Sequence, residues 1–450
     1  MSSCFLHNRL TIMKIAYLTL GCKLNYAETS TYERGFTAAG LQTVQWDEQA
    51  DVYLVNTCSV TQHSDNKCRN IIRKCHRVAP DAAIVVTGCY AQLRREEIQA
   101  IEGVKLVFGA KEKGRVVGDT LKMLGLLKGS PAADEAPKGA PAAVHSATDA
   151  LTYKEISTEM FGAYSDGERT RSFLKVQDGC NNFCAYCTVP FARGESRNIP
   201  IAEAVENARR IASSGIREIV LTGVNTGDFG RSTGESFLDL LKALNDVEGI
   251  ERYRISSIEP NLITDGIIDW IAGGTKFMPH FHIPLQAGDD GILARMGRHY
   301  TTEEFAGRID RIRSAMEGPG RLPVFFGIDL MAGLPGETDG IFESSCRFIA
   351  ERIRPAFIHI FPYSIRPGTR AAKMKDQVRD GIKTERVKRL EELCERLHAE
   401  FEASCRGLEA NVLWEGSEHG GKMYGYTDNY IRLCRDYDPM MAGRIEKVTI

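Results

Sequence analysis

The chain has 450 residues and a formal net charge of −2, and 43% of its residues are hydrophobic. This composition is ordinary for a globular protein, and the length predicts two or three domains. No apolar run is long enough to span a bilayer, and residues 1–13 lack the regions of a signal peptide. We therefore expect a cytoplasmic protein without membrane association. The net charge gives no argument for nucleic-acid binding.

Cysteine is the informative residue type, because the chain holds 13 of them. In a chain without a secretory signal, thiols are expected to stay reduced. The count therefore favours metal ligation or chemistry at sulfur over disulfides.

Residues 14–125 are predicted to form an amino-terminal α/β domain with a parallel, Rossmann-like sheet. Apolar runs alternate there with amphipathic stretches, and the runs are KIAYLTL, DVYLVN, AIVVT and KLVFG. This alternation is typical of strands joined by crossover helices. Residues 126–165 are predicted to be a linker, because the stretch from Lys128 to about Ala150 is rich in Ala, Pro, Gly and Ser.

Residues 166–404 are predicted to form a partial (β/α)6 barrel. Six strand-like runs occur, each followed by helical spacing, and they are SFLKVQ, REIVLTG, RYRISS, FHIPLQ, VFFGIDLMA and AFIHIF. In such barrels the chemistry lies at the carboxyl ends of the strands. A charged helix is expected over about 383–404. Residues 405–450 change to short strands with glycine-rich turns and predict a small all-β module.

Cys180, Cys184 and Cys187 lie in QDGCNNFCAYCTVPFARG, directly after the first barrel strand. Three thiolates within eight residues can wrap one small iron–sulfur cluster, which usually takes four ligands. With three, one iron keeps an open position, as catalytic metals require. A zinc knuckle is the alternative, but it would need a fourth Cys or His in this loop, and the loop has none.

Cys22, Cys58 and Cys89 each close an apolar run, in LTLGCKLN, LVNTCSVT and VVTGCYAQ. The spacing between them corresponds to about one βαβ crossover each. Ligand sites in open parallel sheets form outside the carboxyl ends of the strands, so the three thiols should converge. We expect a second cluster with an open iron. Three separate buried cysteines are the alternative.

The first cysteine loop, with Tyr186 before its last cysteine, resembles the radical S-adenosylmethionine (SAM) superfamily. Together with the second cysteine set, the chain resembles the radical SAM methylthiotransferase family from Lys14 to its end. Further matching stretches are RNIPIAE, EIVLTGVNTGDFG, HIPLQAGDDGILARMGRHY and DLMAGLPGET. Within the family, LGCKLN, NTCSVTQHSD and DGCNNFCAYCTVPFARGESR are most similar to the MtaB type. The last module resembles the TRAM domain, an RNA-binding barrel.

This resemblance implies the function, the cofactors and the partners. The expected reaction adds a methylthio group to carbon 2 of N6-threonylcarbamoyladenosine at tRNA position 37. The expected cofactors are two 4Fe–4S clusters, an auxiliary one on Cys22, Cys58 and Cys89 and a radical SAM one on the other set. Two SAM molecules per turnover serve as methyl donor and as source of the deoxyadenosyl radical. The expected partners are the tRNA anticodon stem-loop and an electron donor such as flavodoxin or ferredoxin, and the chain is expected to be a monomer.

A radical suits this reaction, because carbon 2 of adenine carries no hydrogen acidic enough for a side-chain base near pH 7. The resemblance also implies SAM contacts beyond the second, third and fourth barrel strands. The candidates there are Gly223, Asn225, Ser257, Glu259 and Gln286. Each could equally serve as a turn or cap residue.

Other functions remain open at this point. The substrate could be isopentenyladenosine at the same tRNA position, or the auxiliary cluster could only relay electrons in another radical reaction. A non-catalytic iron–sulfur protein that binds RNA is the third class. Basic stretches at 66–77 and 366–375 are interpreted as solvated helix faces that could also meet phosphates. Of His280 and His282, we expect only one to face the barrel interior, and a structural hydrogen bond for either.

Overall fold

The computed structural model describes residues 12–127, 160–166 and 170–450. The chain divides into two compact units, Met1–Ser146 and Ala147–Ile450, so the division falls within the predicted linker. Most of that linker, residues 128–159, lies outside the described residues. The finer division at 125, 165 and 404 stays a prediction. Among the described residues, no helix is both long and apolar enough to cross a membrane.

The first unit contains a five-stranded parallel sheet in the order β2-β1-β3-β4-β5. Its four long strands are those predicted from the sequence. The additional strand, β2, has three residues at the sheet edge and lacks a buried face, so the sequence has no apolar run from which it could be predicted. The strands are β1 (Lys14–Thr19), β2 (Gln42–Val44), β3 (Val52–Thr57), β4 (Ala83–Gly88) and β5 (Val104–Phe108).

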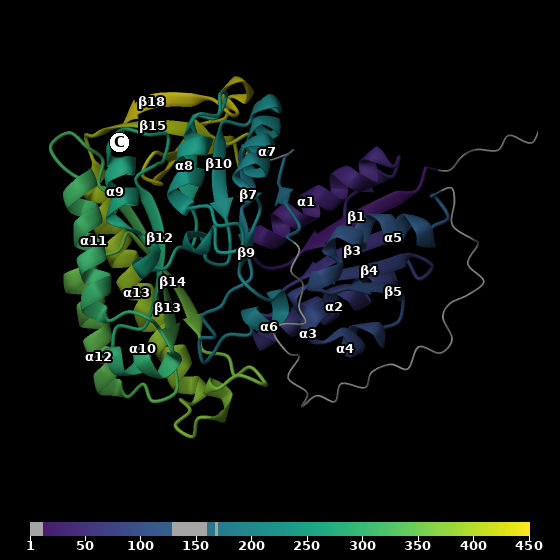
Figure 1. The fold of residues 1–450 in the computed structure, drawn as a ribbon, viewed down its shortest axis with the longest axis horizontal. Helices are drawn as coiled ribbons and strands as arrows, with labels where there is room; N and C mark the ends of the chain where they lie inside the picture. Colours follow the sequence, from purple (N-terminus) through teal and green to yellow (C-terminus); the bar gives the residue numbers. More distant parts are fainter. Residues whose placement is uncertain (1–11, 128–159, 167–169) are drawn as a thin grey trace, which may run out of the picture. The chain divides into compact units, whose positions relative to one another are not determined.

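Helices cover both faces of this sheet, which explains why the central strand β3 is buried along its whole length. Apolar residues of α2, α3 and α4 pack on one face, and α1 and α5 lie on the other (Figure 1). The helices are α1 (Lys23–Ala38), α2 (Gln62–Val78), α3 (Cys89–Leu93), α4 (Arg95–Gln99), the 3-10 turn η1 (Ala110–Arg115) and α5 (Val116–Met123).

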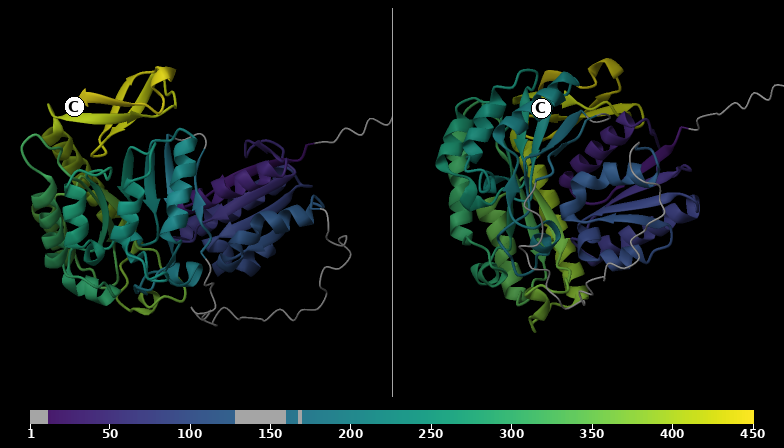
Figure 2. Two further views of the ribbon diagram at one scale, coloured as in Figure 1. Left: turned by 45° about the horizontal axis from the view of Figure 1, so that its top comes forward. Right: turned by 45° about the vertical axis from the view of Figure 1, so that its right-hand side comes forward.

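The second unit contains the six predicted barrel strands, in two parallel groups with β10 between β7 and β11 and β13 between β12 and β14. A bridge between Tyr253 and Phe277 and a bond from Ile258 N–H to His282 O (3.1 Å) join the groups. Figure 2 shows the resulting open, curved array. The strands are β7 (Arg171–Lys175), β10 (Glu218–Thr222), β11 (Arg252–Ile255), β12 (His280–Gln286), β13 (Phe325–Ala332) and β14 (Phe357–Pro362).

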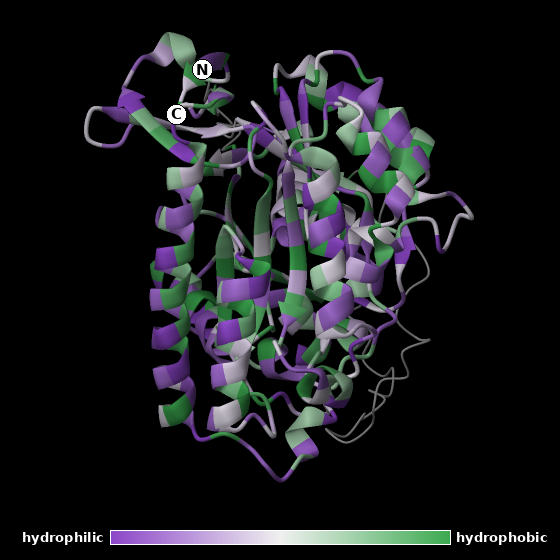
Figure 3. Cartoon of the chain, turned by 90° about the vertical axis from the view of Figure 1, so that its left-hand side faces the viewer, coloured by the Kyte–Doolittle hydropathy of each residue, from purple (hydrophilic) through white to green (hydrophobic). Residues whose placement is uncertain are grey.

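The helices that follow these strands enclose one large apolar core. Purple and green residues alternate along them in Figure 3, as expected for helices with one buried face. They are α6 (Val189–Arg193), α7 (Ile201–Ser213), η3 (Thr226–Asp228), α8 (Phe237–Asn245), η4 (Pro260–Leu262), α9 (Asp265–Ala272), α10 (Asp290–Met296), α11 (Thr302–Met316), α12 (Asp339–Phe348), the π-turn η5 (Ile349–Ile353), η6 (Ala371–Lys373) and α13 (Asp380–Cys405). The charged helix expected at 383–404 is α13.

The end of the predicted linker is not irregular. Residues Ala163–Tyr164 form a short strand, β6, that pairs antiparallel with β7. A two-residue strand has no detectable alternation, so the composition of its surroundings concealed it. A second small ribbon, β8 (Gln177–Asp178) with β9 (Arg197–Asn198), closes the base of the cysteine loop.

The carboxyl-terminal residues form an antiparallel sheet in the order β17-β16-β15-β18. The short strands predicted for this region are present, and β17 and β18 lie at the edges of the sheet. The elements are β15 (Glu409–Trp414), β16 (Lys422–Thr427), β17 (Arg432–Asp436), η7 (Pro439–Met441) and β18 (Ile445–Thr449).

This sheet packs against the amino-terminal ends of β7, β10 and β11 through buried charges. Glu218 is fully buried and pairs with Arg252 and Arg254. These arginines donate to main-chain carbonyls of the last sheet, Arg254 Nη2 to Thr427 O at 2.8 Å and Arg252 Nη1 to Asn411 O at 3.2 Å. Burial would raise the pKa of Glu218, but the arginine charges lower it to about 2. The barrel therefore binds the last sheet at the end of its strands opposite to the cysteine loop.

Candidate cysteine-ligated metal centres

In the first unit, Cys22, Cys58 and Cys89 follow the ends of three neighbouring strands. Cys22 precedes helix α1, Cys58 comes directly after β3, and Cys89 begins α3. Because β1, β3 and β4 are adjacent and parallel, the three residues lie at one edge of the sheet. The structure thus brings together the residues that the sequence places 36 and 31 positions apart.

Two glycines set the close approach at this edge. Gly21 has φ +103° and lies so near Cys58 that a Cβ there would be 2.7 Å from the Cys58 Cβ and 3.0 Å from its Sγ. Gly88 has φ +101°, and its Cβ would collide with the main chain of Thr57. Each glycine directly precedes a cysteine of the set. Only a residue without a side chain can adopt this φ at so close a contact.

Asn25 holds two of these strand ends together from the first turn of α1. Its Nδ2 donates to Leu20 O (2.8 Å) and to Thr57 O (3.0 Å), one residue before Gly21 and one before Cys58, respectively. The amide is buried, so both bonds form away from water. It fixes the spacing of the Cys22 and Cys58 segments.

Cys68 lies next to the set of Cys22, Cys58 and Cys89. The sequence did not predict this position of Cys68. The fully buried thiol donates to Cys58 O at 3.4 Å. Burial raises the pKa of Cys68 to about 12, and the charges of Cys58 and Cys89 add to the rise. Cys68 belongs to the buried face of α2, and its bond to Cys58 O supports the main chain of that residue.

In the second unit, Cys180, Cys184 and Cys187 lie in the loop between β8 and α6, and each sulfur accepts a hydrogen bond. The donors are Asn182 N to Cys180 Sγ (3.5 Å), Val189 N to Cys187 Sγ (3.4 Å) and Arg298 Nη1 to Cys184 Sγ (3.2 Å). Donors at every sulfur suit thiolate ligands, which carry negative charge. These bonds are also one of the means by which proteins set the potential of iron–sulfur clusters.

The protonation behaviour of this loop tests whether it fits a cluster. Burial raises the pKa of Cys180 to about 12 and raises that of Cys187 further, and the charge of Cys184 contributes to both shifts. The buried thiols of Cys180 and Cys187 need a nearby cation to become thiolates, and a bound metal supplies that charge. The loop therefore fits a cluster with three protein ligands.

The base of the loop is fixed by Gln177, a fully buried residue that no motif in the sequence singles out. Its Oε1 accepts from Val224 N (2.9 Å) and Asn225 N (3.0 Å), and its Nε2 donates to Gly179 O (2.8 Å). It thereby joins the start of the cysteine loop to the segment after β10.

Asp178 anchors the same base through buried cations. Its carboxylate pairs with Lys175 Nζ at 2.7 Å and with Arg193 Nη1 at 2.8 Å, and all three side chains are almost completely buried. A buried pair of this kind is costly to disrupt, because the remaining charge stays desolvated. The loop is therefore held at both of its ends, at Asp178 and at Arg193.

The predicted SAM-contact residues fall into two groups. Asn225 and Glu259 are buried and connected, since Asn225 Oδ1 accepts from Glu259 N at 3.3 Å. Glu259 forms an ion pair with Arg298, which also donates to Cys184. A chain of polar contacts thus links two predicted contact residues to the cysteine loop.

The other three predicted contact residues have mainly conformational features. A Cβ on Gly223 would be 2.8 Å from Gln177 Oε1, so this glycine permits the contact described above. Ser257 presents its carbonyl to Thr226 N at 3.0 Å. Gln286 ends β12 in the left-handed region, at φ +68°, next to a register shift in the β12–β13 pairing.

Arg298 is the functional candidate that sequence reasoning missed. It stands in MGRHY, which the resemblance included, but it is 114 residues from Cys184 and no spacing rule connects them. Its guanidinium is also held by Tyr300 Oη at 3.0 Å, and Tyr300 donates to Pro284 O at 2.6 Å. The end of β12 thereby positions a buried cation beside the cysteine loop.

The interpretation of 366–375 as a solvated helix face was wrong. Only Ala371–Lys373 is helical, and Arg366 is buried. Arg370 Nη2 donates to Phe183 O at 3.1 Å, and Ala371 N donates to Ala185 O at 2.8 Å. This basic segment therefore packs on the cysteine loop, and a contact of its exposed cations with phosphates stays a prediction.

The expectation that only one of His280 and His282 faces the interior was also wrong. Residues two apart on a strand share a face, and the alternate residues Phe281 and Ile283 occupy the apolar core. His280 stacks on Phe325 with ring centroids 5.3 Å apart, whereas His282 Nε2 contacts Asp329 Oδ1 at 2.7 Å.

Comparisons with known proteins agree with both units. Residues 14–109 match the family described as "Uncharacterized protein family UPF0004", and residues 174–349 match the "Radical SAM superfamily". The solved structure of the radical SAM methyltransferase TsrM from Kitasatospora setae is similar with a TM-score of 0.55 and 14% identity, covering 80% of this chain and 74% of that one. This likeness supports the fold.

Similarity to curated proteins extends over almost the whole chain. The threonylcarbamoyladenosine tRNA methylthiotransferase MtaB of Bacillus subtilis is 38% identical, over 97% of this chain and 93% of that protein. The tRNA-2-methylthio-N(6)-dimethylallyladenosine synthase of Citrifermentans bemidjiense is 31% identical, over 97% and 96%.

The barrel, the cysteine loop at its strand ends and the superfamily match define a radical SAM enzyme, a class that uses a 4Fe–4S cluster and SAM. The relatives that match this chain over nearly its full length identify the family within this class. The chain belongs to the radical SAM methylthiotransferase family and is of the MtaB type.

Proposed function

We propose that this enzyme adds a methylthio group to carbon 2 of N6-threonylcarbamoyladenosine at tRNA position 37. The observation that carries the proposal is the 38% identity to the Bacillus subtilis MtaB protein over 97% of the chain. The two cysteine sets are consistent with it, because sulfur insertion needs a place for the transferable sulfur besides the site where SAM is cleaved. The target base must leave its stack, which an anticodon loop permits.

Two 4Fe–4S clusters and two SAM molecules per turnover complete the proposal. Cys180, Cys184 and Cys187 would hold the cluster that reductively cleaves SAM, and Cys22, Cys58 and Cys89 would hold the auxiliary cluster. Three thiols in each set leave one iron open for SAM or for sulfur, respectively. When bound, the first cluster and SAM supply the radical that ordinary acid–base groups cannot provide.

Around the proposed first cluster, residues of this chain hold the cysteine loop in place and shield it from water. Arg298 donates to Cys184 Sγ and pairs with Glu259, and Gln177 holds the loop against Asn225. We propose SAM contacts at Gly223, Asn225, Ser257, Glu259 and Gln286, because these residues follow β10, β11 and β12 at the end that bears the cysteine loop. Asn225 and Glu259 are buried there, and the exclusion of water protects a reactive intermediate.

The test of substrate identity uses two otherwise identical anticodon stem-loops, one with threonylcarbamoyladenosine and one with isopentenyladenosine at position 37. The reconstituted enzyme should methylthiolate the first at least tenfold faster, read by mass spectrometry of the nucleosides. A preference for the second would support the runner-up function, which the relative from Citrifermentans bemidjiense favours. Deoxyadenosine formation without methylthiolation of either RNA would favour a different radical reaction.

The proposed partners are the tRNA anticodon stem-loop and an electron donor such as flavodoxin or ferredoxin, and the proposed state is a monomer. The last sheet offers a surface for RNA, since the exposed Arg432 lies 3.8 Å over the ring of Tyr424. A cation on an aromatic ring suits a nucleic-acid chain, which presents phosphates and flat bases.

Deleting the last sheet would be a poor test of RNA binding, because the deletion would leave Arg252 and Arg254 without their carbonyl partners. Replacing Arg432 by Ala should weaken tRNA binding severalfold at one fixed salt concentration and leave uncoupled SAM cleavage unchanged. Arg389→Ala, at an exposed ion pair on α13, is the matched control. Equal tRNA affinity of the Arg432 variant and wild type would exclude this surface.

A further inference from the structure

Three metal-ligating side chains outside both cysteine sets meet on neighbouring strands of the second unit. His282 is on β12, Asp329 on β13 and His359 on β14. Asp329 and His359 are direct cross-strand partners, and Asp329 is also paired with Pro284, two residues beyond His282. Their strand neighbours Ile283, Ile328 and Ile358 lie in the apolar core, so the three polar side chains share the opposite face of the sheet.

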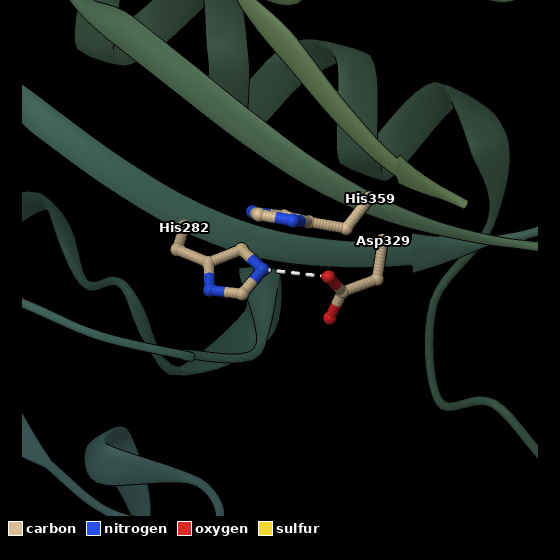
Figure 4. Close-up of side chains that lie close together, drawn as sticks. All are labelled: His282, Asp329 and His359. Atoms are coloured by element: carbon tan, nitrogen blue, oxygen red, sulfur yellow. Dashed lines mark hydrogen bonds and ion pairs between the residues drawn. The ribbon is translucent and has the colours of Figure 1, made fainter. Parts of the chain in front are cut away.

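The three side chains lie close together, as Figure 4 shows, with His282 and Asp329 in direct contact and the ring of His359 beside them. One ligand atom from each lies within 4.8 Å of the other two. His282 Nε2 is 2.7 Å from Asp329 Oδ1, and the two imidazole rings are 4.9 Å apart at 52°. Ligands of a tetrahedral zinc ion are about 3.3 Å apart, for bonds of about 2.0–2.2 Å. Zinc binding would therefore open the 2.7 Å contact between His282 and Asp329 and bring the imidazole of His359, which is exposed on the edge strand β14, closer by side-chain rotation.

We infer that His282, Asp329 and His359 form a binding site for a divalent transition-metal ion, Zn²⁺ in the first instance. Two imidazoles and one carboxylate are a known ligand set for such ions, and they differ from the thiolates that hold iron–sulfur clusters. Among the described residues, no fourth His, Cys, Asp or Glu joins this group, so the ion would keep a position for water or an anionic oxygen.

A His–Asp hydrogen bond without a metal is the plain alternative, and the chain offers an internal control for it. His398 on α13 lies 3.4 Å from Glu402, so it also has a carboxylate neighbour but forms no part of a three-ligand group among the described residues. If a single imidazole beside a carboxylate were enough to retain zinc, the two places would behave alike. The second imidazole, His359, distinguishes them.

The experiment uses the full-length enzyme with its clusters intact, under anaerobic conditions. Wild type, His359→Ala, Asp329→Asn and His398→Ala are incubated with ZnCl₂, desalted and analysed for zinc and iron by mass spectrometry. Wild type and His398→Ala should retain one more zinc per chain than the other two, with equal iron in all four. Competition with a chromophoric chelator should show at least tenfold weaker binding for His359→Ala.

Two precautions guard against misfolded variants. His359 is exposed, so its replacement leaves the core intact, and the thermal unfolding of each variant is measured. Zinc should raise the unfolding temperature of wild type and of His398→Ala, and not that of His359→Ala, because only binding to the folded state stabilises it. Equal zinc retention and affinity in wild type, His359→Ala and Asp329→Asn would overturn the inference. An equal loss of zinc in His398→Ala and His359→Ala would also overturn the inference, because zinc binding would then not depend on this site.

Discussion

The two cysteine sites are built in opposite ways. In the first unit, three thiols come from three separate strand ends, and glycines before Cys22 and Cys89 let those ends approach. In the second unit, three thiols come from one short loop, and residues far away in the chain, such as Arg298, reach in to hold it. One site therefore depends on how well a sheet is assembled, and the other on what surrounds a loop.

The largest expected effect separates the sites by role. Replacing Cys180, Cys184 and Cys187 by Ala should abolish deoxyadenosine formation and remove about half of the iron, if both sites hold 4Fe–4S clusters. Replacing Cys22, Cys58 and Cys89 should also remove about half of the iron, leave deoxyadenosine formation measurable and abolish the methylthio product.

Each triple variant is the control for the other. Circular dichroism and solubility must first show that both are folded, because loss of a metal can unfold its domain. A folded Cys22/Cys58/Cys89 variant that still forms methylthiolated nucleoside at the wild-type rate would place the sulfur source elsewhere. Unchanged iron in the Cys180/Cys184/Cys187 variant would contradict the assignment of the loop.

The second prediction concerns assembly of the first site. Gly88→Ala should lose the auxiliary iron and several kcal/mol of stability, because a Cβ there adds a collision with Thr57 to the strain of φ +101°. Gly40 provides the match, since it has φ +90° in the same unit but no atom within 4 Å of the position that a Cβ would take. Gly40→Ala should cost only the conformational strain, about 1–2 kcal/mol.

Iron content and thermal unfolding, measured side by side, check this prediction. If Gly88→Ala and Gly40→Ala lose the same stability and both keep full iron, close packing at the strand ends does not build the site. The Cys180 loop serves as an internal reference, because its capacity to cleave SAM should be the same in both variants.

Much of this arrangement could be predicted from the sequence, and the reasons are physical. The long buried strands are visible in the sequence as apolar runs. Parallel strands place their carboxyl ends at one edge of the sheet, so the positions of Cys22, Cys58 and Cys89 after β1, β3 and β4 predicted that they lie at one edge. The two-residue strand β6 carries no such signal and was assigned to the linker.

Contacts between residues far apart in sequence could not be predicted in this way. Gln177 and Arg298 act through side-chain hydrogen bonds to residues far along the chain, such as Asn225 and Cys184, and no periodicity encodes such a partner. The basic stretch at 366–375 misled because charge alone does not reveal burial, and Arg366 is buried. The His282–Asp329–His359 group likewise needed the strand register to become visible.

The third prediction tests whether the two ends of the barrel strands are independent. Glu218→Gln should reduce the free energy of unfolding of the second unit by about 3–5 kcal/mol, because Arg252 and Arg254 would remain buried without their counter-charge. Glu251→Gln, at an exposed pair with Arg217, should change stability by less than about 0.5 kcal/mol. The rate of SAM cleavage per folded enzyme should be equal in both.

The pH dependence follows from the lowered pKa of Glu218. Its folded pKa of about 2 lies below the ordinary value of 4.5, so its contribution is complete above about pH 4.5 and is lost as the pH falls toward 2. Above pH 4.5, the free energies of unfolding of Glu218→Gln and Glu251→Gln should therefore differ by a constant amount. A difference that changes between pH 6 and 8 would point to another titrating group.

The smallest expected effect concerns the residue that reaches the cysteine loop from afar. Arg298 places a buried positive charge and a 3.2 Å hydrogen bond on Cys184 Sγ. Reduction adds an electron to a cluster on this loop, and a nearby cation favours the added negative charge, so Arg298→Gln should lower the midpoint potential. Slower electron uptake should reduce deoxyadenosine formation about tenfold, the effect of losing one charge-assisted hydrogen bond of about 1.5 kcal/mol.

A redox titration followed by electron paramagnetic resonance measures that potential directly, and Arg298→Lys should recover part of it by restoring the charge without the planar geometry. Arg308→Gln, which removes an ion pair with Asp265 on the outer helices, should leave the potential unchanged. The auxiliary cluster should keep its own potential in every variant, because its thiols lie in the other unit. If Arg298→Gln keeps the wild-type potential while its iron falls, Arg298 supports the loop mechanically, and the contrast between the two sites lies in packing alone.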